Sequence, residues 1–119
     1  MDQSTVVLRY RDGRTERAPF AAINADEKSV AVTRDGATVN VPFSELKALF
    51  FPRTNPDDEP DTATGSTISV EFADGEVIRG IAHYNPERNG FFLFPHDRSK
   101  NDRIFVVNSA IVSIEVEKL

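Results

Sequence analysis

TVVLRYRDGRTER at residues 5–17 returns 62 positions later as TISVEFADGEVIR at residues 67–79. The two stretches share their first threonine, their Asp-Gly pair and their last arginine, and the apolar residues alternate in the same register. A second match relates VNVPFSELKAL at 39–49 to IFVVNSAIVSI at 104–114. Self-similarity at a fixed period is the signature of repeated units. The sequence therefore predicts an internal duplication, with the extra residues of the second copy in the loop at 96–103.

Each copy has the pattern of short β-strands joined by tight turns. In the first stretch Val6, Leu8 and Tyr10 alternate with mostly polar residues, as in a strand with one buried face. The Asp-Gly pair that follows supplies the positive φ that tight hairpin turns need. A further hairpin is predicted at 34–36, and a short helical turn before an apolar strand at 44–47 and again at 108–110. We expect about five strands in each copy.

The predicted fold is therefore all-β, with two tandem five-stranded small barrels of Sm-like or SH3-like type that pack together. The first barrel is expected at 1–53 and the second at 67–119. The segment PRTNPDDEPDTATGS at 52–66 holds three prolines and a net acidic charge. Because prolines lack a backbone donor and these polar side chains cannot form a core, residues 54–66 are predicted to be an exposed linker.

Composition excludes several classes of protein. The chain has 119 residues, a formal net charge of −5 and no cysteine. The lack of cysteine excludes disulfides, Cys-ligated metal sites and thiol catalysis. An acidic chain is a poor binder of duplex nucleic acid, so a nucleic-acid partner is not expected. No apolar run is long enough for a membrane helix and no secretory signal is recognised, so a cytoplasmic location is expected.

The second copy resembles the Sm-like family of small barrels. The stretch VEFADGEVIRGIAHYNPERNGFFLF at 70–94 is similar to the first Sm motif, with Asp74-Gly75, then Gly80, then Asn89 ahead of an apolar strand. FVVNSAIVSIEV at 105–116 is similar to the second Sm motif. The whole chain also resembles a family of uncharacterised bacterial proteins, chiefly myxobacterial, that carry two such units in tandem. This resemblance implies the fold but supplies no activity.

The Sm resemblance implies RNA binding, yet the residues expected for it are incomplete. Sm proteins bind RNA through two loops, and the second of these carries an Arg/Lys-Gly pair. This chain has Val107-Asn108-Ser109 at that place and lacks the cation that would contact phosphate. A PilZ-type nucleotide site is disfavoured because its two arginines would here be one residue too far apart. The remaining candidate for anion binding is the loop with Arg98, Lys100 and Arg103, weighed against a solvated charged hairpin.

A second basic cluster lies in the first strand and turn. It consists of Arg9, Arg11, Arg14 and Arg17, with Glu16 among them. Opposite charges on neighbouring strands usually form cross-strand ion pairs. We therefore predict ion pairs here, such as an arginine opposite Glu16, rather than a site for a polyanion.

FFLF at 91–94 is apolar on both faces of a strand, which indicates burial on both sides. One face would fill the barrel of the second copy. The other face needs a cover, because large exposed aromatic patches are uncommon on monomers. The first copy, through Leu49 and its neighbours, or a second chain would provide it. The candidate interaction surface is therefore Phe92, Phe94, Phe50 and Phe51, in a monomer or a homodimer.

Catalytic and metal-binding arrangements are not recognised. His83 and His96 are the only histidines, and no motif supplies them with partners. The acidic residues at 57–61 lack the spacing of an EF-hand. We expect no catalytic residues, metal or cofactor, and a non-enzymatic interaction or adaptor module with an unidentified protein partner. Two alternatives remain: an Sm-like or PilZ-like nucleic-acid or nucleotide binder, and a homo-oligomeric assembly protein whose sheet edges pair.

Overall fold

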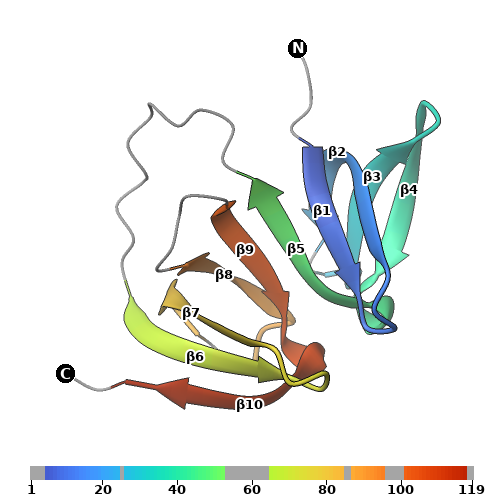
Figure 1. Ribbon diagram of the computed structural model, residues 1–119. Coiled ribbons are helices and arrows are strands. Elements are labelled where there is room, and N and C mark those ends of the chain that lie inside the picture. The colour runs from blue at the N-terminus through green and yellow to red at the C-terminus, as the bar shows by residue number, and fades with distance from the viewer. Residues whose placement is uncertain (1–4, 25, 53–64, 85–86, 96–100, 118–119) are drawn as a thin grey trace.

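The computed structural model of the chain is built almost entirely from antiparallel strands (Figure 1). It describes residues 5–24, 26–52, 65–84, 87–95 and 101–117. The first five strands are β1 (Thr5–Tyr10), β2 (Thr15–Asn24), β3 (Ser29–Arg34), β4 (Ala37–Pro42) and β5 (Leu46–Pro52). The other five are β6 (Ser66–Phe72), β7 (Val77–Ala82), β8 (Gly90–Pro95), β9 (Asn101–Val107) and β10 (Ile111–Val116). The all-β class predicted from the sequence is confirmed.

Two 3-10 turns complete the described structure. The turn η1 (Phe43–Glu45) leads into β5, and the turn η2 (Asn108–Ala110) leads into β10. Both lie where the sequence suggested a short helical turn before an apolar strand. The proposed linker at 54–66 falls outside the described residues except for its last two positions, and Ser66 already begins β6.

The Asp-Gly turns form as the sequence predicted. The amide of Tyr10 donates to the carbonyl of Arg14 (2.9 Å), and in the second turn the amide of Phe72 donates to the carbonyl of Glu76 (3.0 Å). In the third hairpin Asp35 (φ 51°) and Gly36 (φ 81°) both have positive φ, as a type I′ turn requires. Local chemistry therefore fixes which strands become neighbours.

The strand order of the sheet is β10-β6-β7-β8-β9-β5-β1-β2-β3-β4. Each half of the chain places its fifth strand beside its first and continues in sequence order to its fourth. The halves join where β5 pairs with β9, in a register from Ala48↔Val106 to Pro52↔Asn101. We predicted two barrels packed together. Instead the halves share one open sheet, because the free edge of β5 finds its hydrogen-bonding partners on β9.

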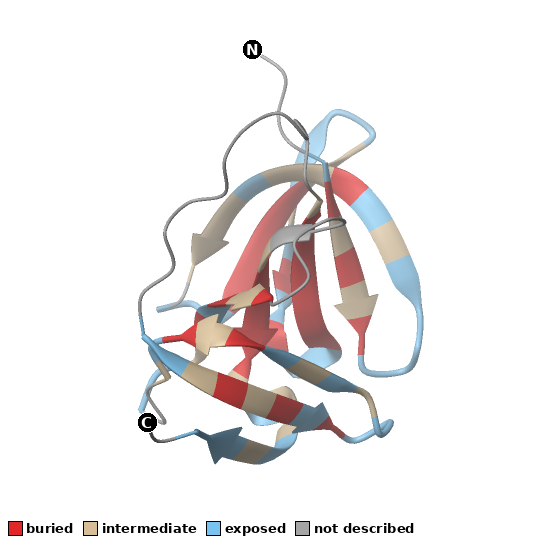
Figure 2. Cartoon of the chain, turned by 60° about the vertical axis from the view of Figure 1, so that its left-hand side comes forward, coloured by how far each residue is buried: buried red, intermediate tan, exposed pale blue. Residues whose placement is uncertain are grey.

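Two hydrophobic cores lie on either side of the β5–β9 pair. Successive side chains of a strand point to opposite faces. Accordingly Leu49 and Phe51 enter the first core, whereas Ala48 and Phe50 enter the second. The same holds on β9, where Phe105 packs in the first core and Val106 in the second. Figure 2 shows the buried residues concentrated on these central strands, while the strand leading to the C-terminus is mostly exposed.

A buried tyrosine holds the first hairpin to the end of β3. The Tyr10 hydroxyl donates to the Glu16 carboxylate (2.6 Å) and accepts a hydrogen bond from Nη2 of Arg34 (2.8 Å). Arg34 also pairs with Glu16, so the predicted ion pair on Glu16 forms with an arginine of β3. Burial, together with the hydrogen bond and charge of Glu16, raises the pKa of Tyr10 to about 12.

Alkaline conditions are therefore expected to destabilise the fold through Tyr10. Between pH 10 and about 12 the unfolded chain loses the phenolic proton while the folded chain keeps it, so the free energy of unfolding falls as the pH rises. Urea denaturation of the wild type and of Tyr10→Phe at several pH values measures this. The variant should lose less stability across this range. Parallel pH profiles for the two proteins would contradict the assignment.

Candidate functional site

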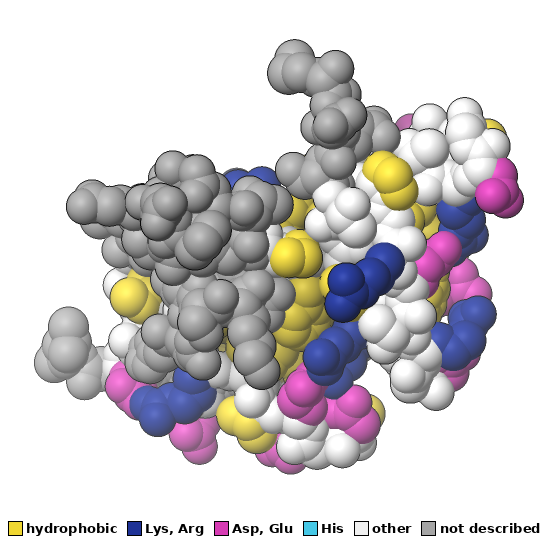
Figure 3. Space-filling model, turned by 45° about the horizontal axis from the view of Figure 1, so that its top comes forward, with side chains coloured by type: hydrophobic (Ala, Val, Ile, Leu, Met, Phe, Trp, Pro, Cys, Tyr) yellow, Lys and Arg dark blue, Asp and Glu magenta, His cyan; other side chains and the backbone are white. Residues whose placement is uncertain are grey.

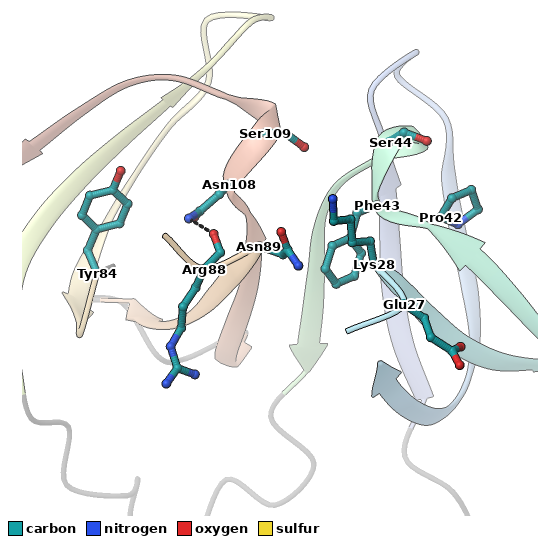
Figure 4. Close-up of a pocket in the computed structure, with 10 residues that line it drawn as sticks. All are labelled: Glu27, Lys28, Pro42, Phe43, Ser44, Tyr84, Arg88, Asn89, Asn108 and Ser109. Carbon is teal, nitrogen blue, oxygen red and sulfur yellow. Dashed lines mark hydrogen bonds between the residues drawn. The ribbon is translucent and has the colours of Figure 1, made fainter. Parts of the chain in front are cut away.

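Two neighbouring cavities open between the two halves of the chain and share Tyr84 and Arg88. The polar cavity has a volume of about 600 Å³ and is lined by Glu27, Lys28, Pro42, Phe43, Ser44, Tyr84, Arg88, Asn89, Asn108 and Ser109 (Figure 4). The aromatic cavity has a volume of about 680 Å³, and nine of its ten lining residues come from the second half. We call the two cavities together the junction groove.

The polar cavity is built from matching turns of the two halves. The amide of Phe43 donates to the carbonyl of Lys28 (2.8 Å), and the amide of Asn108 donates to the carbonyl of Asn89 (2.9 Å). The side-chain amide of Asn108 also donates to the carbonyl of Arg88. Figure 4 shows Lys28 and the η1 residues on one side of the space, with Arg88 and the other second-half residues on the other.

The charge of the polar cavity is slightly positive. Lys28 and Arg88 line it together with a single carboxylate, Glu27. Neutral donors and acceptors complete the lining, chiefly the two asparagines and two serines. Such a cavity suits a partner group that carries one negative charge and accepts several hydrogen bonds.

The aromatic cavity lies along β8. Phe91, Phe92, Phe94 and Phe105 line it with Tyr84, and Ile23 of β2 contributes from the first half. The Phe92 ring is 37% exposed and lies 5.3 Å from the Phe105 ring centroid and 5.9 Å from that of Phe51. The rings are therefore held by aromatic packing on one side while Phe92 remains open to solvent on the other.

Two of the four aromatic residues predicted as an interaction surface lie at this groove. Phe92 and Phe94 both line the aromatic cavity. Phe50 and Phe51 do not contribute to the surface, because both are buried in the cores. Within one chain the second face of FFLF is only partly covered, because Phe92 is still 37% exposed. β5 is buried on both faces over residues 46–51 because it has a core on each face, and β9 is likewise buried on both faces over residues 104–107.

Only part of the predicted anion-binding loop lies within the described residues. Arg98 and Lys100 lie outside the described residues. The guanidinium carbon of Arg103 lies 4.6 Å from the Phe51 ring centroid and 5.0 Å from that of Phe92. No described acidic residue pairs with it. Arg103 therefore acts as a cation–π contact that supports the wall of the aromatic cavity.

The other predicted basic cluster is largely occupied by contacts within the chain. Arg9 pairs with Glu76 (3.0 Å), and Arg14 pairs with Asp12 (2.7 Å). The guanidinium of Arg11 donates to main-chain carbonyls of η1 and β5. On the face in Figure 3, Lys and Arg side chains lie beside Asp and Glu rather than in a separate positive field. The arrangement agrees with the predicted ion pairs.

Sequence analysis missed Lys47, a buried lysine that ties the halves together. Its Nζ atom lies 2.7 Å from Asp74 and 2.5 Å from Glu76, and 4.8 Å from the centroid of the Phe72 ring. The hydrogen bond from Lys47 holds the pKa of Asp74 below its usual range. Lys47 occupies the extra position where β5 bulges against β1, so its side chain leaves the normal alternation of the strand.

The comparison with known families covers nearly the whole chain. A family model described as "Family of unknown function (DUF6982)" matches residues 2–118. The chain belongs to this family. No curated protein and no solved structure shows significant similarity to it. Membership of DUF6982 agrees with the resemblance to uncharacterised proteins noted from the sequence, and the function has to be argued from the groove itself.

Two structural features are absent from the described part of this DUF6982 chain. Within it, no three His, Asp or Glu side chains are grouped closely enough to hold a metal ion. No helix in the same residues is long and apolar enough to cross a membrane. The junction groove combines an aromatic floor with charged and amide groups, which is the composition of a recognition site.

Proposed function

We propose that this chain is a non-enzymatic protein-interaction module that binds a short segment of a partner protein in the junction groove. The observation that carries the proposal is Phe92, a ring 37% exposed within an aromatic cavity of about 680 Å³. Exposed aromatic residues in a preformed depression are typical anchors of protein interfaces.

The two parts of the groove define the chemistry of the partner. The aromatic cavity accommodates one large apolar side chain, which would stack against Phe92 and Phe94. The adjoining polar cavity presents Lys28 and Arg88 against one carboxylate, so it favours an acidic residue beside the apolar one. We therefore propose a peptide that carries an aromatic or large aliphatic residue close to an Asp or Glu. Nucleic acid has less support, because Arg9 and Arg14 are engaged in ion pairs.

We further propose that the chain is a tandem duplication of one Sm-like or SH3-like unit. The same strand order in both halves and the matching hydrogen bonds in the Asp-Gly turns support this origin. The groove would then be a product of the duplication, because it lies where corresponding turns of the two units face each other. A bacterial origin rests on the family resemblance alone. A cytoplasmic location is part of the same proposal and rests on the lack of cysteine.

Selection from a displayed random-peptide library on the immobilised full chain tests the function. Selected peptides should share a large apolar residue within a few positions of an acidic residue. The variant Phe92→Ala should lose at least tenfold in affinity for them, as expected for an interface anchor. Val77→Ala serves as the matched control, because Val77 is an exposed apolar residue on β7 outside both cavities.

A charge reversal separates recognition from a general loss of folding. In Arg88→Glu the library should yield peptides with Lys or Arg in place of the acidic residue, while circular dichroism and the melting temperature stay near those of the wild type. If the wild type selects no consensus, or if Phe92→Ala binds the selected peptides as well as Val77→Ala does, the groove is not the binding site.

A further inference from the structure

The described sheet ends in two strands, β4 and β10, that each have one free edge. We propose that the chain assembles head to tail, with β4 of one molecule pairing antiparallel with β10 of a second copy. The pattern for this contact is already present within the chain as the β5–β9 junction. The proposal concerns a different surface from the junction groove and does not depend on the function proposed for it.

β4 and β10 are the counterparts of the two strands that form the junction. β4 and β9 each lead into a 3-10 turn. The first amide of each turn donates to the carbonyl of the residue just before the preceding strand: Phe43 donates to Lys28, before β3, and Asn108 donates to Asn89, before β8. β5 and β10 each follow that turn and bulge at the same place against the first strand of their half. Because β9 pairs with β5 within the chain, their counterparts β4 and β10 are left at the two ends of the described sheet, each with one edge that has no partner strand. They lie on opposite sides of the molecule in Figure 1.

The direction of the backbone groups can be followed along each free edge. In an antiparallel strand the amide and carbonyl of successive residues point alternately to the two sides. The amide of Phe43 points toward β3. On β4, therefore, the backbone amides and carbonyls of Thr38 and Asn40 point away from β3, toward the free edge. The amide of Glu117 donates to the carbonyl of Thr67 on β6, so on β10 the groups of Ile114 and Val116 point outward.

The register of the internal junction selects these same residues. Leu49↔Phe105 becomes Ile114↔Asn40 when each residue is replaced by its counterpart 65 positions away. The pair Phe51↔Arg103 becomes Val116↔Thr38 in the same way. The register taken from the repeat and the outward direction of the backbone groups thus agree. Each of the two pairs would exchange two hydrogen bonds across the contact.

Side-chain burial shows what β10 lacks. In the first half Leu49 and Phe51 are buried, because β9 adds Phe105 to their core. Their counterparts on β10 are less covered: Ile114 is half-buried and Val116 is 44% exposed. A β4 strand from a second copy would lie over them. Since it presents Asn40 where β9 presents Phe105, this contact should be weaker than the internal junction and depend on concentration.

The charges beside the junction also carry over, with their signs reversed. Within the chain Arg9 pairs with Glu76 across the junction (3.0 Å). Their counterparts 62 positions away are Glu71 and Arg14, so the same geometry would bring Glu71 of one molecule to Arg14 of the next. Glu71 is exposed and pairs with no described cation, whereas Arg14 is exposed and pairs only with Asp12. Charge complementarity therefore favours a second copy as the occupant of this edge.

Light scattering after size exclusion, run over a series of concentrations, tests the assembly. The wild type should exceed the 13.2 kDa of one chain as concentration rises. Asn40→Pro and Val116→Pro each remove one outward amide and place a proline ring against the incoming strand, so each alone should stay monomeric. An equimolar mixture should form dimers and nothing larger, because each variant keeps the edge that the other lacks.

A charge exchange tests the same register without proline. Glu71→Arg and Arg14→Glu should each weaken assembly about two- to fivefold, the range of an exposed ion pair, and the double variant should restore it. Circular dichroism of each variant confirms that the sheet is kept. Weak specific complexes have dissociation constants up to ~1 mM, so a wild type that is still monomeric at a protein concentration of ~1 mM overturns the proposal. So does assembly that both proline variants retain, or a mixture of them that stays monomeric.

Discussion

Replacing Phe105 with alanine is expected to lower the free energy of unfolding by about 3–5 kcal/mol. Phe105 belongs to β9 of the second half, but its buried side chain packs in the first core. Its ring centroid lies 5.7 Å from that of Phe43 and 5.3 Å from that of Phe92. Removing the ring leaves a cavity at the junction of the two halves, which neither core can refill from its own strands.

The form of the unfolding transition matters as much as its midpoint. Because β5 and β9 each send side chains into both cores, we expect the two halves to unfold together in one transition. Urea denaturation of the wild type and of Phe105→Ala, followed by circular dichroism and by tyrosine fluorescence, measures this. Tyr10 reports on the first half and Tyr84 on the second, and a Tyr→Phe change at either one isolates the other.

The matched control is Phe94→Ala, because Phe94 is half-buried and belongs to neither core. It should cost clearly less stability than Phe105→Ala. Two separate transitions in the wild type, or equal losses for the two phenylalanine variants, would show that the halves are independent and that the junction contributes little.

Local structure was predictable because its causes lie within a few residues. The alternation of Val6, Leu8 and Tyr10 forms a strand wherever one face is buried, and glycine after aspartate closes a tight hairpin. Gly13 and Gly75 have the positive φ that these turns require. The short turns before β5 and β10 followed from the same local pattern.

The strand that separates the two cores was not predictable in this way. FFLF and ALFF both consist of apolar residues, and the sequence does not show which of the two strands has a core on each face. In the structure β5 holds that position because it pairs with β9, a contact between residues 49 to 58 positions apart. Lys47 was overlooked for the same reason, since its partners Asp74 and Glu76 belong to the other half.

The candidate groove was half predictable. Phe92 and Phe94 stood out because four consecutive bulky apolar residues exceed what one core face needs. Lys28, Tyr84 and Arg88 gave no signal, because each is an ordinary polar or aromatic residue in a turn. They form a site only when the sheet brings the corresponding turns of the two halves together.

Gly80→Ala is expected to destabilise the chain by about 3 kcal/mol, the upper range for overfilling a packed site. A Cβ atom at Gly80 would lie 2.3 Å from the carbonyl oxygen of Phe94 and 2.6 Å from Cδ2 of Leu93. The first of these neighbours is backbone and cannot turn aside. Relief requires β7 and β8 to separate, and they are joined through only three residue pairs in the described sheet, from Gly80↔Pro95 to Ala82↔Leu93.

Gly75→Ala provides the contrast for this prediction. Gly75 has a φ of +89° and open space around its added Cβ, so alanine there costs only the strain of the left-handed region, about 1–2 kcal/mol. Thermal and urea unfolding of both variants should rank Gly80→Ala as the more damaging. Phe94, which the added methyl group would displace, lines the aromatic cavity. Gly80→Ala should therefore also lower the affinity for the peptides selected from the library, whereas Gly75→Ala should leave this affinity unchanged. If Gly80→Ala proved the less destabilising of the two variants, this result would contradict the close approach of β7 to β8 at Gly80.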